Sequence, residues 1–193
     1  MNIIRSLALA AVAASLLFAA PHAFAQGREM KIGDQPGYIP DDEEVSPEFK
    51  RTAVFFRTTE APGTIIISTS ERFLYLVQGN GRALRYGIGV GRDGFRWGGV
   101  HRITAKKEWP SWTPPAQMLR RRPDLPRHMV GGPDNPLGAR AMYLGSTLYR
   151  IHGSNEPETI GQAVSSGCFR MVNDDVIDLY DRVRVGATVI VKN

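Results

Sequence analysis

The sequence contains little cysteine, few aromatic side chains and few long apolar runs. It has 193 residues, of which one is cysteine and 9% are aromatic. A single cysteine excludes an intramolecular disulfide. The 20 glycines and 13 prolines favour turns and short elements over a long-helix bundle or coiled coil. With 42% apolar and 22% charged residues, the chain fits one globular domain and is neither collagen-like nor wholly disordered.

The longest apolar run lies at the amino terminus and is typical of a secretory signal peptide. A basic start, the apolar residues 6–20 and an A-x-A site ending at Ala25 form the three-part pattern. A membrane anchor is the alternative, but a span needs about 20 apolar residues and Pro21 follows the run directly. We therefore predict that residues 1–25 are removed and that the mature protein is exported, periplasmic or wall-associated, with no membrane span.

Charge is distributed unevenly along the rest of the chain. Residues 26–50 carry seven acidic and three basic side chains, whereas residues 51–193 carry twenty basic and twelve acidic ones. An acidic, proline-containing segment with few apolar residues buries too little surface to order itself, which predicts a flexible leader over residues 26–50. The basic body, residues 51–193, favours an anionic partner. Cell-wall material fits an exported protein better than nucleic acid, whose aromatic-basic modules are missing.

Several segments of the body have the composition of β-strands. Residues 64–70 (TIIISTS) and 73–78 (FLYLVQ) are β-branched or aromatic, and Gly79-Asn80-Gly81 allows a tight reversal into a second strand. The blurred alternation of FLYLV indicates a strand covered on both faces. Residues 140–151 and 187–191 are also strand-like. Between them, Asn173 is predicted to cap a helix.

Two glycine- or proline-rich segments lack regular structure. Residues 87–99 contain six glycines but neither the G-x-G-x-x-G nor the P-loop pattern, so bulges and turns are expected instead of a phosphate site. Residues 109–136 hold seven prolines, an arginine cluster, and Trp109 and Trp112. A connection this long is often a lid or binding loop, with one helical turn expected at residues 118–122. The two tryptophans are candidates for substrate contact.

The single cysteine lies in a small, flexible turn, SSGCFR, at residues 165–170. Cys168 is either a buried apolar filler or a reactive thiol. The turn lets backbone N–H groups converge near its side chain, and Arg170 follows two residues later. A nearby cation and oriented amides favour the thiolate, which is the nucleophilic form.

A thiol nucleophile also needs a proton acceptor. The mature chain offers three histidines, of which His152 has the most suitable setting because it ends a strand-like run and precedes a glycine. His101 and His128 are expected to be ordinary surface or core residues. One cysteine and scattered histidines do not provide the paired ligands of a zinc site, so no metal is expected.

The His-Gly pair at residues 152–153, followed by S-x-G-C-x-R at residues 165–170, resembles the L,D-transpeptidase (YkuD-like) catalytic domain. Met171, Asn173 and Asp175 belong to the same pattern, and the resemblance covers residues 64–193. It implies a mainly β, glycine-rich, sandwich-like domain with a long proline-rich lid loop and one or two short helices.

The resemblance also implies roles for individual residues. Cys168 is the nucleophile, and His152 is the base, oriented by the Gly153 carbonyl. Gly167 and Cys168 provide backbone N–H groups to an oxyanion hole. Arg170 holds the turn together or meets a substrate carboxylate.

One position departs from the family pattern. Many relatives have histidine directly before the Gly-Cys pair, whereas this chain has Ser166. Any orienting role of that histidine either is missing here or passes to the Ser166 hydroxyl.

The implied reaction is acyl transfer on peptidoglycan stem peptides without a cofactor. Cys168 attacks the diaminopimelate carbonyl of a tetrapeptide stem and expels the terminal D-Ala. The thioester then passes to an amine on another stem, giving a 3→3 crosslink, or to an envelope protein, while water gives a carboxypeptidase.

Chain order argues against one other reading, and two further alternatives remain open at this point. In papain-like wall endopeptidases the cysteine precedes the histidine, the reverse of the order here, whereas a sortase has the observed order but a wider gap and a later arginine. A non-catalytic module that binds peptidoglycan through its basic body is the alternative from a different class.

Overall fold

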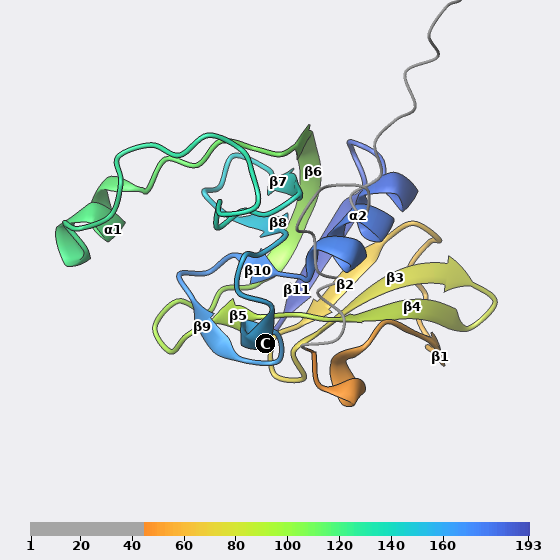
Figure 1. The fold of residues 1–193 in the computed structure, drawn as a ribbon. Coiled ribbons are helices and arrows are strands. Elements are labelled where there is room, and N and C mark those ends of the chain that lie inside the picture. The colour runs from red at the N-terminus through yellow and green to blue at the C-terminus, as the bar shows by residue number, and fades with distance from the viewer. Residues whose placement is uncertain (1–44) are drawn as a thin grey trace, which may run out of the picture. The chain divides into compact units, whose positions relative to one another are not determined.

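A bent nine-stranded sheet forms most of the computed structural model, which describes residues 45–193 (Figure 1). Its strands are β1 (Thr52–Phe55), β2 (Ile65–Ser68), β3 (Phe73–Gly79), β4 (Arg82–Gly87), β6 (Gly99–Glu108), β7 (Arg140–Leu144), β8 (Arg150–His152), β10 (Phe169–Arg170) and β11 (Thr188–Lys192). Their order across the sheet is β1-β4-β3-β2-β11-β6-β7-β8-β10. A separate parallel pair consists of β5 (Val90–Gly91) and β9 (Ala163–Ser165).

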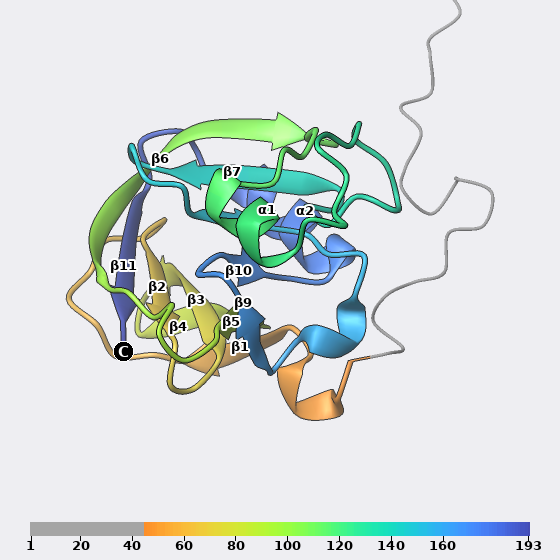
Figure 2. The same ribbon diagram turned by 90° about the vertical axis from the view of Figure 1, so that its left-hand side faces the viewer.

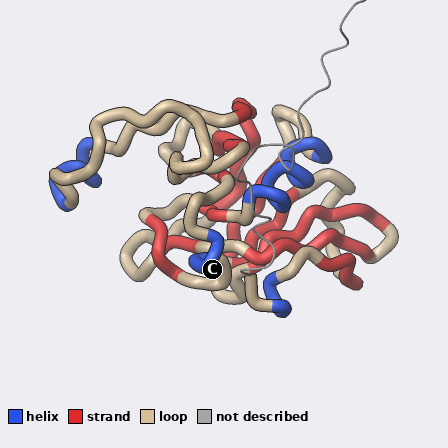
Figure 3. Tube along the Cα trace, in the orientation of Figure 1, coloured by secondary structure: helices blue, strands red, loops and turns tan. Residues whose placement is uncertain are grey.

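Helices are few and short (Figure 3). The two α-helices of the described residues are α1 (Ala116–Arg121) and α2 (Asn173–Arg182), and two 3-10 turns, η3 (Pro47–Phe49) and η4 (Pro157–Thr159), accompany them. No helix within residues 45–193 is long and apolar enough to cross a membrane.

The sheet folds over at β6, which pairs with β11 through its first half and with β7 through its second half. A register shift between Ile103 and Ala105 lies at this change of partner, and such bulges bend a strand. α2 lies between the two halves of the folded sheet (Figure 2). The core accordingly combines residues from both halves and from α2, including Ile65, Leu74, Tyr86, Met142, Leu144, Val176 and Leu179. The predicted mainly β, sandwich-like class is confirmed.

The predicted hairpin is β3–β4, and its turn uses left-handed backbone at Asn80 (φ +52°). Both faces of β3 are covered, as the sequence predicts. Leu74 lies in the core, while on the other face the Phe73 ring packs against Phe49 with centroids 5.3 Å apart. Tyr75 stacks on Phe56 at 4.5 Å.

The predicted signal peptide and most of the predicted acidic leader lie outside the described residues. The last residues of the leader, 45–49, are described and pack on the domain. Val45 is buried with Ile160 and Val172, and Phe49 contacts the same cluster. Packing therefore begins before residue 50, because apolar Val45 and Phe49 find a complementary surface.

The long loop between β6 and β7 carries α1 and extends away from the sheet (Figure 1). Its two limbs are joined by reciprocal backbone hydrogen bonds between Trp112 and Met129, both 2.8 Å. The Asn135 side-chain amide donates to the carbonyls of Pro110 and Val130 at 3.2 and 2.8 Å. These bonds give the proline-rich segment a defined shape, and α1 occupies the place of the predicted helical turn.

Candidate active site

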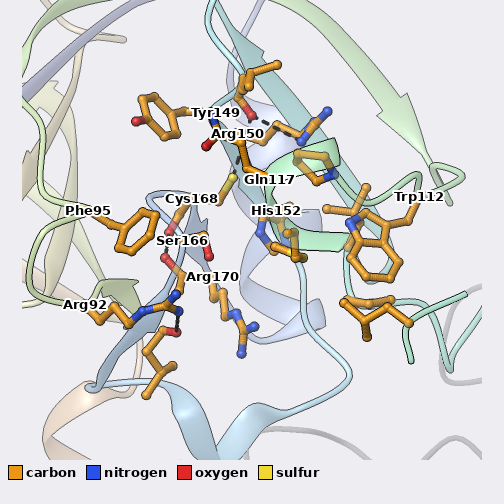
Figure 4. A pocket seen from close by; sticks show the side chains of 18 of the residues that line it. Arg92, Phe95, Trp112, Gln117, Tyr149, Arg150, His152, Ser166, Cys168 and Arg170 are labelled. Atoms are coloured by element: carbon orange, nitrogen blue, oxygen red, sulfur yellow. Dashed lines mark hydrogen bonds between the residues drawn. The ribbon is translucent and has the colours of Figure 1, made fainter. Parts of the chain in front are cut away.

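Strand register brings the two sequence motifs together. β8 and β10 are parallel neighbours in which Phe169 lies opposite Ile151 and Arg170 lies opposite His152. Side chains alternate along a strand, and Ile151 and Phe169 are fully buried in the core. His152 and Arg170 therefore project to the other face, where Cys168 also lies, next to Arg150 (Figure 4).

This face forms the floor of a cavity of about 660 Å³, which the lid loop partly covers. Trp112, Met118 and Arg121 line it from the lid, and Arg92 and Phe95 line it from the β5–β6 loop. Among its described lining residues, one is acidic, Glu156, and five are arginines: Arg92, Arg121, Arg122, Arg150 and Arg170. The cavity is thus strongly cationic and suits an anionic ligand.

His152 is buried, and its Nδ1 lies 2.5 Å from the carbonyl oxygen of Gly153. A carbonyl only accepts hydrogen bonds, so Nδ1 carries the proton and Nε2 keeps its lone pair. Burial lowers the pKa of His152 to about 3, with Arg170 and Arg150 adding to the effect of burial and the bond to Gly153 opposing it. At neutral pH the imidazole is uncharged and can accept a proton at Nε2.

The Cys168 thiol points toward the turn between β7 and β8. Its Sγ lies 3.9 Å from the carbonyl oxygen of Leu148, to which it donates, and among residues 45–193 no hydrogen bond joins it to His152. Burial raises the pKa of Cys168, although the Arg150 amide and side chain and Arg170 lower it. The resting group is therefore a neutral thiol. The nearby cations and amides predict a thiolate from the sequence, but the effect of burial on the pKa of Cys168 is larger than theirs.

The turn that carries Cys168 is tied together by one serine. Ser165 Oγ accepts from the Gly167 N–H at 3.1 Å and donates to the Cys168 carbonyl at 2.6 Å. The Gly167 amide is thus already engaged, and the Cys168 amide has no acceptor within the described part of the chain. Of the two amides expected to form an oxyanion hole, this geometry favours that of Cys168. Ser166 lines the cavity.

The sequence predicts that Asn173 caps α2, and this prediction is wrong. The helix begins at Asn173 itself, after Val172 in the cap position. The buried Asn173 Oδ1 accepts from the Ala139 N–H at 2.8 Å, and its Nδ2 donates to the Ser154 carbonyl at 2.9 Å. The side chain therefore joins the end of the lid loop to the turn after His152. It leaves no room for a Cβ at Gly153, which would lie 2.3 Å from Oδ1.

The other candidates differ in their distance from the cavity. Arg170 lines it and pairs with Glu156 at 2.6 Å, which ties β10 to the segment before η4. Trp112 lines the cavity, whereas Trp109 lies at the root of the lid and is not among the lining residues.

The other two histidines of the described chain lie away from the cavity. His128 lies within 3.1 Å of Thr113 on the lid, and neither it nor His101 lines the cavity. Among the described residues, no three His, Cys, Asp or Glu side chains are grouped as metal ligands.

Sequence reasoning missed Arg150, Tyr149, Phe95 and Trp97. A signal existed for Arg150, because it lies two residues before His152 on one strand and so on the same face. The others come from turns and from the glycine-rich segment, where no periodicity marks a side chain as inward-facing.

Fold and site together define a class: a β-rich domain with an imidazole at the end of one strand and a thiol directly before the parallel neighbouring strand, beneath a lid. Residues 62–191 match the family model described as the L,D-transpeptidase catalytic domain, YkuD. The chain belongs to this family.

Relatives and solved structures extend the comparison. The chain is 37% identical to "Probable L,D-transpeptidase YbiS" of Escherichia coli K12 over 135 residues, 66% of this chain and 43% of that protein. "Probable L,D-transpeptidase ErfK/SrfK" of the same strain is 38% identical over 134 residues, 65% and 42% of the two chains. This chain thus spans less than half the length of these curated relatives.

A crystal structure described as "Probable carnitine operon oxidoreductase caia" from Brucella melitensis is 47% identical, with a TM-score of 0.52, over 76% of this chain and 96% of that chain. An L,D-transpeptidase from Mycobacterium smegmatis superposes with a TM-score of 0.56 at 17% identity, over 69% and 59% of the two chains. The second likeness concerns the fold alone.

Proposed function

We propose that this chain is the catalytic domain of an exported peptidoglycan L,D-transpeptidase that uses Cys168 as nucleophile and His152 as base. The observation that supports this most directly is that His152, at the end of β8, and Cys168, directly before the neighbouring strand β10, both line one cationic cavity. Family membership and the L,D-transpeptidase names of the relatives point to the same reaction.

The first step is acylation of Cys168. The thiol rotates about its Cα–Cβ bond from the Leu148 carbonyl toward His152, and Nε2 takes its proton as Sγ attacks the stem carbonyl. The Cys168 N–H stabilises the negative charge on the tetrahedral oxygen. Collapse breaks the amide bond, His152 returns the proton to the leaving nitrogen, and D-Ala departs from a thioester.

The second step reverses the roles with a new amine. Neutral His152 takes a proton from the incoming amine as its nitrogen attacks the thioester carbon. The carbon–sulfur bond breaks, and the Cys168 thiol is restored with the proton that the base received. Energy comes from the amide that the first step cleaved, so the cycle consumes no nucleotide.

The charge of the cavity supports an anionic stem peptide as substrate. Arg92, Arg121 and Arg150 line it without a carboxylate within salt-bridge distance in the described residues. Arg170 is occupied by Glu156, which favours a role in holding the nucleophile turn. A stem peptide carries several carboxylates that can pair with the unoccupied guanidinium groups.

The glycine-rich segment bears on the oxidoreductase description of the Brucella structure. In this chain, residues 87–99 lead through β5 into β6 and not into a helix, so they do not form the strand-turn-helix of a dinucleotide site. The segment instead supplies cavity residues Arg92 and Phe95.

The test is a comparison of the purified wild type with Cys168→Ala on a diaminopimelate tetrapeptide stem. We expect D-Ala release and crosslinked product to disappear in the variant, and a carbapenem to add its mass to the wild type alone. Product formation by the alanine variant at the wild-type rate would overturn the thioester route, whereas no product from either protein would favour a non-catalytic wall-binding module.

Mass spectrometry of wall digests identifies the acceptor. Cells with the protein are expected to contain diaminopimelate-to-diaminopimelate crosslinks if a stem is the acceptor, stems bearing a protein fragment if an envelope protein is, and tripeptide stems if water is. Identical digests from cells with and without the protein would contradict an activity on the wall.

A further inference from the structure

Trp97 lies outside the predicted site, on the loop between β5 and β6, yet it contacts the turn that carries Cys168. Its indole Nε1 donates to the carbonyl oxygen of Gly167 at 2.7 Å. This N–H···O distance is at the short end of the usual range. Trp97 and Gly167 are far apart in sequence, so the bond fixes one loop against the other.

Three aromatic contacts hold the indole in place. Trp97 stacks on Tyr149 with centroids 4.3 Å apart and an interplanar angle of 9°. The His101 and Trp97 rings form a T-shaped contact with centroids 4.9 Å apart, and the Phe169 centroid lies 5.3 Å from that of Trp97. An indole with these neighbours has little freedom to turn its N–H elsewhere.

Tyr149 also contacts the nucleophile turn directly, next to Cys168 (Figure 4). A Cβ added to Gly167 would lie 2.4 Å from the Tyr149 ring, so the ring packs against the glycine backbone. Gly167 adopts φ +111°, a conformation that side-chain-bearing residues rarely adopt. The peptide between Gly167 and Cys168 is thus held in an unusual orientation from two sides.

This peptide contains the amide that the mechanism uses. In a planar trans peptide, the C=O and the N–H point in opposite directions. Anchoring the Gly167 oxygen therefore also directs the Cys168 N–H, which has no acceptor among the described residues. A hydrogen bond to the carbonyl also polarises the peptide and makes its N–H a stronger donor.

We propose that Trp97 is a positioning residue that directs the Cys168 amide toward the tetrahedral oxyanion by holding the Gly167 carbonyl. The inference rests on the proposed function only in taking Cys168 as the acylated residue. Trp97 itself is not among the residues that line the cavity.

The experiment compares two reagents that report on one thiol, because the chain has a single cysteine. p-Nitrophenyl acetate acylates Cys168 through a tetrahedral oxyanion, forming a thioester and releasing p-nitrophenolate. Iodoacetamide alkylates the same sulfur by displacing iodide at a saturated carbon, and no oxyanion forms. Cys168→Ala supplies the background rate for both reagents.

The indole N–H is removed in two ways. Trp97→Phe keeps an aromatic ring, and site-specific replacement of Trp97 by 3-benzothienylalanine keeps the bicyclic shape with sulfur in place of N–H. We expect acylation of Cys168 to fall about tenfold in both variants, because a displaced oxyanion donor weakens transition-state stabilisation, while alkylation changes less than about twofold. Circular dichroism and thermal melting check the fold.

Tyr75→Phe is the control, since it removes an aromatic hydrogen bond, to Glu71 at 3.1 Å, on the distant hairpin. Both rates are expected to stay at the wild-type value. The proposal is overturned if acylation is unchanged in the Trp97 variants, if both rates fall together, if the benzothienyl variant does not fold, or if Tyr75→Phe loses acylation selectively. Stem-peptide turnover by Cys168→Ala would instead overturn the proposed function and leave the two-reagent comparison intact.

Discussion

The buried Asn173 side chain connects three segments around His152. It accepts from Ala139 and donates to Ser154, two residues after His152. Asn173→Ala leaves the Ala139 N–H and the Ser154 carbonyl, which are both buried, without these hydrogen bonds. We expect a loss of about 2 to 3 kcal/mol of unfolding free energy, measured by urea denaturation, together with slower acylation.

Asn155→Ala is the matched control for this prediction. Asn155 is exposed and donates to the Asp134 carbonyl at 3.2 Å. Its replacement is expected to change stability by less than about 0.5 kcal/mol. Equal effects of the two substitutions would contradict the bridging role of Asn173.

The low pKa of His152 and the raised pKa of Cys168 predict the pH dependence of acylation. The imidazole is neutral above about pH 3, so the base is available across the physiological range. Because the reacting pair is a neutral thiol and a neutral imidazole, the acylation rate should be level from weakly acidic to neutral pH and change only where the thiol itself ionises, at a pKa that burial raises. Single-turnover acylation by a stem peptide should therefore show no acidic limb near the ordinary histidine pKa of about 6.5.

His152→Gln distinguishes the contribution of the imidazole to the acylation rate from that of thiol ionisation. It should lower acylation about a hundredfold or more at every pH, while the pH profile of iodoacetamide alkylation stays in place. An acidic limb near the ordinary histidine pKa in the wild type would show that His152 is solvated and would contradict the buried geometry.

At the scale of elements, the lid is held to the body by an aromatic ring between two cations. Phe95 of the β5–β6 loop faces the Arg92 guanidinium at 4.4 Å and the Arg121 guanidinium, on α1, at 5.2 Å. Phe95→Ala removes both contacts, each worth about 0.5 to 1 kcal/mol. The lid should open more often, and trypsin should cleave its arginines about two to five times faster, as measured by mass spectrometry.

Phe55→Ala is the control for the lid experiment, because Phe55 is 90% exposed at the end of β1. Cleavage within the lid should stay at the wild-type rate in this variant. Unchanged cleavage in Phe95→Ala would mean that the contact between Phe95 and Arg121 does not hold the lid.

Elements were predictable from sequence where local chemistry determines them. The β3–β4 hairpin follows from β-branched and aromatic runs around Gly79-Asn80-Gly81, and α2 follows from its helical spacing. The place of β11 does not follow from such patterns. It lies inside the sheet, parallel to β2 and antiparallel to β6, because pairing between distant segments decides strand order.

The site was predictable to a similar extent. Cys168 and His152 stand out by residue type and by the glycines beside them. Trp97 and Asn173 act through backbone groups of distant segments, and no local pattern reports which carbonyl a side chain will reach. The resting charge of the thiol also depends on burial, which the sequence does not contain.

At the scale of the whole molecule, a polar network around the buried Tyr86 hydroxyl joins the sheet to α2. The hydroxyl of fully buried Tyr86 donates to the Asp178 carboxylate at 2.7 Å. Arg51 and Arg182 form ion pairs with the same carboxylate. Burial raises the pKa of Asp178, but the hydrogen bonds from Arg182 and Tyr86 outweigh it and lower the pKa overall.

A depressed carboxyl pKa stabilises the fold above the unfolded-state pKa of about 4, and this stability is lost as the pH falls through the folded-state pKa. Asp178→Asn should therefore cost about 1 to 3 kcal/mol at neutral pH, with the difference from wild type shrinking below about pH 4. Urea denaturation across a pH series measures this difference. Asp93→Asn, at a surface pair in which Asp93 is 94% exposed, is the control and should show little change at any pH. A difference for Asp178→Asn that does not vary with pH would contradict this linkage.

The resting position of the Cys168 sulfur has a consequence for chemical durability. Thiolates attack peroxides and disulfides far faster than protonated thiols do. A thiol that stays protonated at rest, with its Sγ toward the Leu148 carbonyl, is therefore expected to resist oxidation.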